Sequence, residues 1–309
     1  MAGAIIAAWL ADRMLGDPAR FHPVAGFGRA AGALEQRIWR QSRRLGAVYA
    51  LSLVGAVAAA VAAAESLTRK GPWPTRAIVR VVVVWATLGG RSLERSALRL
   101  AELVEHGELG PARALAPTLV GRDPSSLDGP ELCRAAVESV AENTTDAVVA
   151  PLLWAALLGA PAAGAYRAAN TLDSMVGHRT LRHLRFGWAA ARLDDAASWP
   201  GARLAVILAS LAAPVVGGCR ASAWRTAFED GSLHPSPNAG LIEGAFAGAL
   251  SVRLGGVNRY GHGEERRPTL GRGEPPGVGD VSRAVRLARA VGCSAALVCA
   301  ILARVGRNS

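Results

Sequence analysis

The sequence predicts an all-α, polytopic integral membrane protein with roughly four or five membrane segments and helical polar loops. Of its 309 residues, 51% are hydrophobic and only 19% are charged, a composition that excludes a disordered chain. An uncharged block of 20 residues fills 45–64, enough for a helix to cross a hydrocarbon core of about 30 Å. Strand-like alternation is scarce, and its main candidate, 78–85, fits a membrane helix equally well.

Other apolar blocks predict the remaining membrane segments. The block 147–166 is as long as the first but contains Pro151 and Pro161, so we expect a broken or re-entrant segment there. Shorter blocks at 81–90, 204–219 and 290–303 are read as spans, re-entrant helices or buried helices.

The polar segments between these blocks also read as helices. Residues 92–106 place apolar side chains on one stripe, and Asp128 or a neighbour can cap a helix through 131–140. Residues 262–282 are rich in Gly, Pro and charge and predict an exposed loop. We therefore predict a single membrane-embedded domain over 1–309.

The charge pattern favours a membrane over nucleic acid. The formal net charge is +11, but the arginines are scattered between apolar blocks without basic runs interleaved with aromatics. Lys70 is the only lysine, and it lies outside any Gly-Lys-Ser/Thr phosphate loop. Four cysteines show neither zinc-site spacing nor a disulfide framework.

Arginines flanking the first block suggest an orientation. The arginines before the block are Arg37, Arg40, Arg43 and Arg44, whereas Arg69, Lys70 and Arg76 follow it. The positive-inside rule therefore favours a cytoplasmic N-terminal side.

Four polar clusters accompany the apolar helices: 12–23, 138–146, 167–177 with 186–195, and 234–240 followed by Arg253 and the glycine-rich run 255–261. Ionisable side chains beside membrane segments are costly and tend to mark a functional site. Glu138, Glu142 and Asp146 share a helical row, so they would repel one another unless a divalent cation or an arginine lies between them.

Two further patterns in these clusters have both structural and functional readings. Asn238 can cap a following helix through 243–250. The glycine-rich run could hold a phosphate through backbone amides.

At these same residues the chain resembles the CobD/CbiB family of cobalamin biosynthesis proteins, the adenosylcobinamide-phosphate synthases. The matching stretches are DRMLGDPARFHPV at 12–24, ENTTDAVVAPLLWAALLGAPAAGAYRAANTLDSMVG at 142–177, FGWAAARLDD at 186–195 and HPSPNAGLIEGAFAGALSVRLGGVNRYG at 234–261. One departure is Ala147, where the family often has glycine.

The resemblance implies a multi-pass enzyme of the cell (inner or plasma) membrane with a cytoplasmic active face. It would join adenosylcobyric acid to (R)-1-aminopropan-2-ol phosphate through an ATP-dependent amide bond, and Mg²⁺ is implied with ATP. Other late corrin-pathway membrane enzymes are possible partners, and no nucleic acid is expected.

Within the clusters we predict three groups of functional residues. The catalytic group is Glu142, Asp146, Asp173, His22 and His234. The substrate- and phosphate-binding group is Arg167, Arg192, Arg253, Asn143, Asn170, Ser174, Asn238 and Asn258. The metal-binding group is Asp12, Asp17, Asp194 and Asp195.

Two other classes of function fit the same pattern. A transporter or permease for an anionic or corrinoid solute would also have broken apolar helices with polar residues beside them. A non-catalytic membrane scaffold would leave the four polar clusters without a role.

Overall fold

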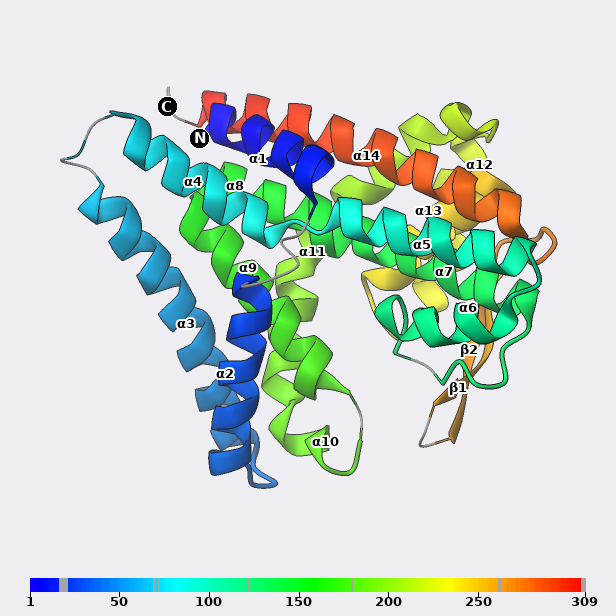
Figure 1. The fold of residues 1–309 in the computed structure, drawn as a ribbon, viewed down its shortest axis with the longest axis horizontal. Helices are drawn as coiled ribbons and strands as arrows, with labels where there is room; N and C mark the ends of the chain where they lie inside the picture. Colours follow the sequence, from blue (N-terminus) through cyan, green and yellow to red (C-terminus); the bar gives the residue numbers. More distant parts are fainter. Residues whose placement is uncertain are drawn as a thin grey trace. The chain divides into compact units, whose positions relative to one another are not determined.

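The computed structural model describes residues 1–16, 22–68, 71, 73–121, 123–178, 180–260 and 263–306. In this part of the chain, helices form all of the regular structure except one two-stranded sheet (Figure 1). Among the described residues, three helical segments are long and apolar enough to cross a membrane: Arg43–Leu67, Trp188–Val216 and Val278–Val305. The predicted class, an all-α membrane protein, is confirmed.

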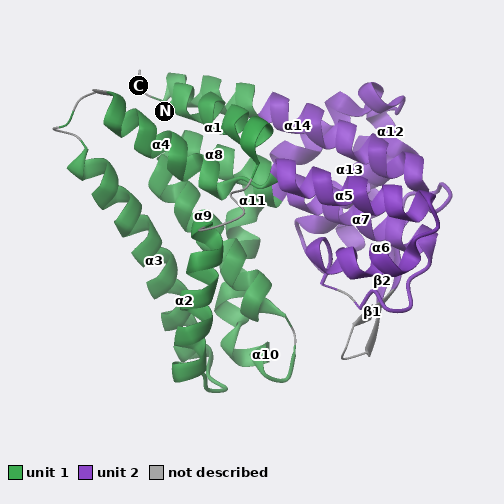
Figure 2. Cartoon of the chain, in the orientation of Figure 1, with its two compact units in different colours: residues 1–89, 146–201, 296–309 green, residues 90–145, 202–295 purple. Residues whose placement is uncertain are grey.

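The chain divides into two compact units, coloured separately in Figure 2. Unit 1 comprises residues 1–89, 146–201 and 296–309, and unit 2 comprises residues 90–145 and 202–295. The segments of the two units alternate along the chain, and the single domain over 1–309 stays a prediction.

Unit 1 is helical throughout its described residues. Its elements are α1 (Ala2–Leu15), α2 (Pro23–Ile38), α3 (Arg43–Leu67), α4 (Trp73–Thr87), α8 (Ala150–Leu158), α9 (Ala160–Leu172), η3 (Asp173–Gly177), α10 (His183–Phe186), the first half of α11 (Trp188–Ala212) and the end of α14 (Val278–Val305). The π-helical turn η2 (Thr145–Val149) begins at the boundary and continues into α8.

A small aromatic core joins the helices of unit 1. The rings of Tyr49 and Phe186 lie 5.1 Å apart between centroids, and the Tyr49 hydroxyl donates to the carbonyl of Ala31 at 3.1 Å. Leu172 and Val176 are buried in the same core. Side chains from α2, α3, α9, η3 and α10 therefore fix the ends of these helices together.

The second apolar block is broken, as its prolines predicted. α8 ends at Leu158, its C-cap residue Gly159 has a φ of 88°, and Pro161 lies in the first turn of α9. Glycine adopts positive φ without steric cost, and proline is tolerated where the helix restarts. The 147–166 block and the 81–90 block thus lie in helices shorter than the three candidate spans.

Unit 2 surrounds one fully buried helix. Its elements are α5 (Gly90–Glu105), α6 (Leu109–Leu115), η1 (Ala116–Thr118), α7 (Gly129–Thr144), the second half of α11, η4 (Ala213–Val216), α12 (Arg220–Glu229), η5 (Gly231–Leu233), α13 (Ala239–Leu250), β1 (Leu254–Tyr260), β2 (Gly263–Leu270) and most of α14. Every residue of α13 is buried.

Glycines allow α12 and α13 to pack closely. A Cβ on Gly244 or Gly248 would meet the backbone of Thr226 or Ser222 on α12. Such four-residue spacing of small residues is typical of tightly packed membrane helices.

Two local predictions for unit 2 have different outcomes. The Asp128 cap is confirmed, because its carboxylate accepts from the amide of Glu131 and the Glu131 carboxylate accepts from the amide of Asp128. The exposed loop over 262–282 is wrong in part, since β2 pairs antiparallel with β1 and α14 starts at Val278.

Candidate functional site

Polar side chains from three elements of unit 1 meet in one hydrogen-bonded network. Asp146 comes from η2, Tyr166 and Asn170 from α9, and Asp194 and Ser198 from α11. The two π-helical turns of unit 1, η2 and η3, coincide with the sequence motifs around Asp146 and Asp173. Single π-helical turns within α-helices are frequent at functional sites.

The amide of Asn170 joins the two carboxylates of this network. Its Nδ2 donates to Oδ2 of Asp146 at 3.1 Å and to Oδ1 of Asp194 at 3.2 Å. Its Oδ1 accepts from Nη1 of Arg167 at 3.4 Å, which orients the amino group toward the carboxylates. Four residues predicted from the sequence, Asp146, Arg167, Asn170 and Asp194, are thereby brought together.

Two hydroxyl groups complete a chain of contacts between the carboxylates. The Tyr166 hydroxyl donates to Oδ1 of Asp146 at 3.4 Å, and Ser198 Oγ donates to Oδ1 of Asp194 at 3.4 Å. The two hydroxyl oxygens lie 3.1 Å apart. The chain thus has three oxygen–oxygen contacts, but the two hydroxyl groups supply only two hydrogens. A third hydrogen, carried by either Asp146 or Asp194, would let every contact be a hydrogen bond.

Tyr166 itself stays protonated. Burial raises the pKa of Tyr166 well above its usual value, and the nearby Asp146 and Asp194 raise it further. The residue therefore acts as a hydrogen-bonding hydroxyl.

Tyr166 and Ser198 are not among the residues predicted from the sequence, although the sequence contains a usable signal for both. Tyr166 precedes Asn170 by four residues, and Ser198 follows Asp194 by four, so each pair shares a helix face.

The donor set of this network fits a magnesium ion. Mg²⁺ is commonly bound by one or two carboxylates together with substrate phosphates, and Asp146 and Asp194 offer two carboxylates held by a common amide. Within the described residues, no group of three His, Cys, Asp or Glu side chains is placed to hold a metal alone. Any ion bound here would therefore need oxygen ligands from substrate or water.

Three further predicted residues bond or pack locally. Ser174 Oγ donates to the carbonyl of Asn170 at 3.1 Å, and Asn143 Nδ2 donates to the carbonyl of Ser139 at 3.0 Å. A Cβ on Gly177 would collide with the Asp173 carboxylate, so the carboxylate lies close to this glycine at the end of η3. These contacts stabilise their own helices.

In unit 2, arginine lies beside the predicted carboxylate row. Arg134 Nη1 donates to Oε1 of Glu138 at 3.1 Å and to the carbonyl of Gly255 at 2.7 Å. The Gly255 amide donates to the same Glu138 oxygen at 2.9 Å. The Gly255 amide is thus engaged by a carboxylate in this structure, and the phosphate-holding role of the run 255–261 stays a prediction.

Glu142 lies one turn further along α7. Burial raises the pKa of Glu142, Arg267 lowers it, and Glu138 raises it again. Two members of this row thus have an arginine beside them, Arg134 at Glu138 and Arg267 near Glu142.

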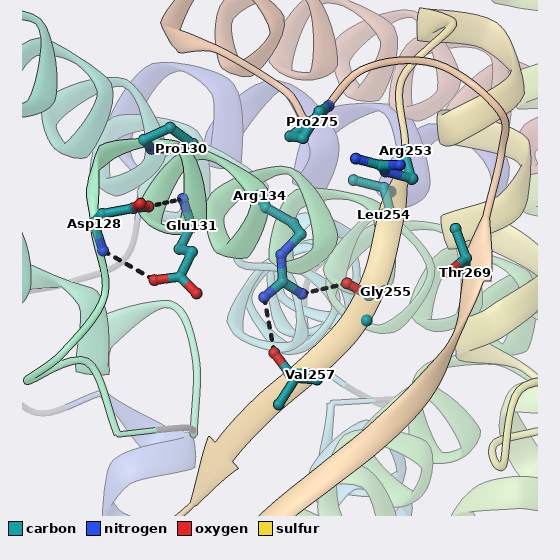
Figure 3. A pocket seen from close by; sticks show the side chains of 11 residues that line it. Asp128, Pro130, Glu131, Arg134, Arg253, Leu254, Gly255, Val257, Thr269 and Pro275 are labelled. Carbon is teal, nitrogen blue, oxygen red and sulfur yellow. Dashed lines mark hydrogen bonds between the residues drawn. The ribbon is translucent and has the colours of Figure 1, made fainter.

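A cleft of about 540 Å³ lies between the start of α7 and the hairpin (Figure 3). From α7, the Arg134 side chain reaches across the cleft and donates to the carbonyls of Gly255 and Val257. Arg253 also lines the cleft, on the side of the hairpin. The predicted clamp residue Arg253 therefore lines a cleft of unit 2, whereas the Asn170 network belongs to unit 1.

The 234–240 motif also lies in unit 2. His234 is buried, and its Nδ1 accepts from the amide of Ser236 at 3.1 Å. Asn238 occupies the N-cap position of α13 without a side-chain cap, so the predicted capping contact is wrong. Its Oδ1 instead accepts from Nη1 of Arg203 at 2.7 Å, while Ser236 Oγ accepts from the amide of Ala239.

The remaining predicted residues are dispersed. His22 caps α2 by accepting from the amide of Val24, and Asp12 is buried on α1. Arg192 and Asp195 form a partly exposed ion pair at 3.9 Å, so adjacent Asp194 and Asp195 have different partners. Asp17 and the side chain of Asn258 lie outside the described residues.

The fold and the site thus define a helical membrane protein with a partly buried network of two carboxylates. Residues 5–288 match the family model described as CobD/Cbib protein, and the chain belongs to this family. It is a protein of cobalamin biosynthesis.

Curated relatives cover nearly the whole chain. The chain is 54% identical over 293 residues to the cobalamin biosynthesis protein CobD of Mycobacterium tuberculosis, covering 95% of this chain and 93% of the relative. It is 43% identical over 276 residues to the protein of that name from Geobacter metallireducens, covering 87% and 86%. No solved structure matches.

Proposed function

We propose that this protein is an ATP-dependent acid–amine ligase that joins adenosylcobyric acid to (R)-1-aminopropan-2-ol phosphate. Family membership supports the pathway, and the network of Asp146, Asn170 and Asp194 is the observation that supports ligation. A carboxylate is a poor electrophile because its oxygen is a poor leaving group. Transfer of a phosphoryl group from ATP to the corrinoid carboxylate would give an acyl phosphate, from which the amine would displace phosphate.

The residues of the network suit the second step. Amide formation releases a proton from the attacking nitrogen, and a positioned carboxylate can accept it. Asp146 and Asp194 are the two ends of a hydroxyl chain that accommodates one additional proton. Arg167 and Asn170 hold this chain in place. Magnesium, when bound by Asp146 and Asp194, would neutralise phosphate charge.

The proposed ligase works at the cytoplasmic face of the cell membrane. ATP and the phosphorylated amine are charged and cannot cross the hydrocarbon core unaided. Residues that handle them must therefore be reached from the cytoplasm, where other late corrin-pathway enzymes are possible partners.

The direct test measures ATP consumption and amide product with purified full-length protein, adding each substrate alone and then both. Ligation predicts turnover only with both substrates. Asp194→Asn should reduce it about 100-fold or more, on the scale of lost acid–base catalysis. The adjacent Asp195→Asn should reduce it far less, because Asp195 pairs with Arg192. Solute transport without ATP-dependent coupling would overturn the ligase proposal in favour of a permease.

A further inference from the structure

Two of the candidate membrane spans begin side by side. Arg43 is the first residue of α3, and Trp188 is the first residue of α11. The guanidinium carbon of Arg43 lies 5.5 Å from the centroid of the Trp188 ring, within the range of a cation–π contact. Both spans therefore begin at one level, marked by a tryptophan and an arginine.

A second stacked pair lies between the end of α2 and the segment before α10. The guanidinium carbon of Arg182 is 4.6 Å from the centroid of Trp39, and Trp39 Nε1 donates to the Arg182 carbonyl at 3.2 Å. Arg182 Nη2 also binds Oε1 of Glu35 at 2.9 Å. These contacts hold the 35–44 and 180–188 segments together.

We call the surface formed by these segments the basic collar. It comprises Trp39, Trp188 and the exposed arginines Arg37, Arg40, Arg43, Arg44, Arg182 and Arg185. Within the described residues 35–44 and 180–188, Glu35 is the single acidic side chain, so positive charge is in clear excess.

Exposed apolar side chains accompany this charge. Leu181 is 89% exposed, Leu184 is 57% exposed and Trp188 is 43% exposed. Arginine, tryptophan and leucine together at the start of a span are typical of a membrane–water interface, where apolar groups enter the acyl region and basic groups meet phosphate.

We propose that the basic collar binds anionic phospholipid headgroups. A negatively charged leaflet attracts each nearby arginine, so the five collar arginines other than Arg182, which binds Glu35, supply a preference over zwitterionic lipid. The exposed leucines favour lipid over a soluble polyanion, because only lipid offers both a phosphate and an apolar region.

The far end of α3 carries a smaller excess of positive charge. There, Glu65 binds Arg80 at 2.8 Å and lies 3.9 Å from Arg76, and Arg69 and Lys70 follow α3 in the sequence. The collar has six arginines against one carboxylate and the far end has four basic residues against one, so the positive-inside rule assigns the collar end to the cytoplasmic leaflet. Asp194 follows Trp188 by six positions, about 9 Å along α11 at 1.5 Å per residue.

The test uses the full-length protein in a neutral detergent supplemented with phosphatidylglycerol, phosphatidylcholine or inorganic phosphate, and measures the thermal unfolding midpoint. Phosphatidylglycerol should raise the midpoint, phosphatidylcholine should raise it far less, and added salt should weaken the difference. An equal effect of both lipids would overturn the proposal. If inorganic phosphate raised the midpoint as much as phosphatidylglycerol does, the collar would be a phosphate site and the lipid proposal would be overturned.

Matched triple variants separate the collar from net charge. Arg37→Gln/Arg40→Gln/Arg185→Gln keeps both stacked pairs and should lose at least half of the phosphatidylglycerol-induced rise. The control variant is Arg95→Gln/Arg225→Gln/Arg286→Gln, in which three exposed arginines of unit 2 are replaced. It loses the same amount of charge, but its unfolding midpoint should still rise with phosphatidylglycerol as in the wild type. Equal losses in both variants would contradict a localised lipid site. Ligase activity in soluble assay mixtures is a separate readout, so failure of lipid binding leaves the proposed function intact.

Discussion

The side-chain amide of Asn170 donates a hydrogen bond to Asp194 at 3.2 Å, although the residues lie 24 positions apart. The same nitrogen donates to Asp146, 24 positions earlier in the chain. Two carboxylates from different elements are thus held by one neutral donor, which offsets part of their mutual repulsion. We therefore expect Asn170 to be the residue of this network that tolerates substitution least.

Asn170→Asp tests this relationship with almost no change in shape. The variant replaces the shared donor by a third carboxylate, so we expect Asp146 and Asp194 to move apart and ligase turnover to fall on the order of 100-fold. The measurement is the initial rate of amide formation with both substrates saturating.

Thr171→Val is the control for this variant. Thr171 is the next residue on α9, and its hydroxyl donates to the carbonyl of Arg167 within the same helix. Its loss should change turnover by less than about threefold. If Asn170→Asp retains normal turnover, the network is structural.

Tyr166→Phe removes one hydroxyl from the chain between the carboxylates. The ring remains to fill the buried space, so the protein should fold, but Asp146 and Ser198 each lose a contact. Loss of a hydrogen bond to a charged group costs about 1.5–3 kcal/mol, which corresponds to a turnover lowered roughly 10- to 150-fold if the contact acts in the transition state. Steady-state rates over pH 6–9 provide the measurement, and an unchanged rate profile would rule out the proton-holding role.

Glu142 gives a prediction about pH and stability. Because burial raises its pKa in the folded protein, the folded state holds this proton more tightly than the unfolded chain does. The stability that this tighter proton binding contributes is fully present below the ordinary glutamate pKa of about 4.3. It is lost as the pH rises through the raised pKa of Glu142 in the folded protein. Glu142→Gln should therefore unfold at a higher temperature than the wild type near pH 7, with the difference shrinking toward pH 4.5.

Unfolding midpoints in detergent across this pH range test the idea, with Glu105→Gln as the control. Glu105 is exposed at the end of α5, so its replacement should leave the pH dependence unchanged. A Glu142→Gln curve parallel to that of the wild type would contradict the burial argument. The same variant also tests the predicted catalytic role of Glu142, since a structural carboxylate would leave turnover near normal.

Much of the helical architecture followed from composition and block length. The 45–64 block became α3, and prolines correctly predicted a break in 147–166, because these effects are local to the chain. The hairpin was not predicted. Its first strand has positive φ at Gly255 and Gly256 and is bound by Arg134 and Glu138 of α7, partners more than 100 positions away.

The sequence predicted several residues of the candidate site but not how they lie relative to one another. Asp146, Asn170 and Asp194 were singled out, yet their separation in sequence gives no distance between them. The same reasoning grouped Asp194 with Asp195, which the helix turns toward different partners. The π-helical turns at η2 and η3 also shift side chains away from the positions that regular 3.6-residue spacing predicts.

The approach of α3 to α10 gives a prediction with an internal control. A Cβ on Gly46 would collide with the backbone carbonyl of Phe186, beneath the basic collar, whereas a Cβ on Gly55 would meet no atom within 4 Å. Both glycines lie in α3, so alanine brings the same gain in helix propensity at each. Gly46→Ala should lower stability by about 1–3 kcal/mol through overpacking, while Gly55→Ala should leave it equal or slightly higher. Unfolding midpoints of the two purified variants test this, and equal midpoints would show that α3 and α10 can separate without cost.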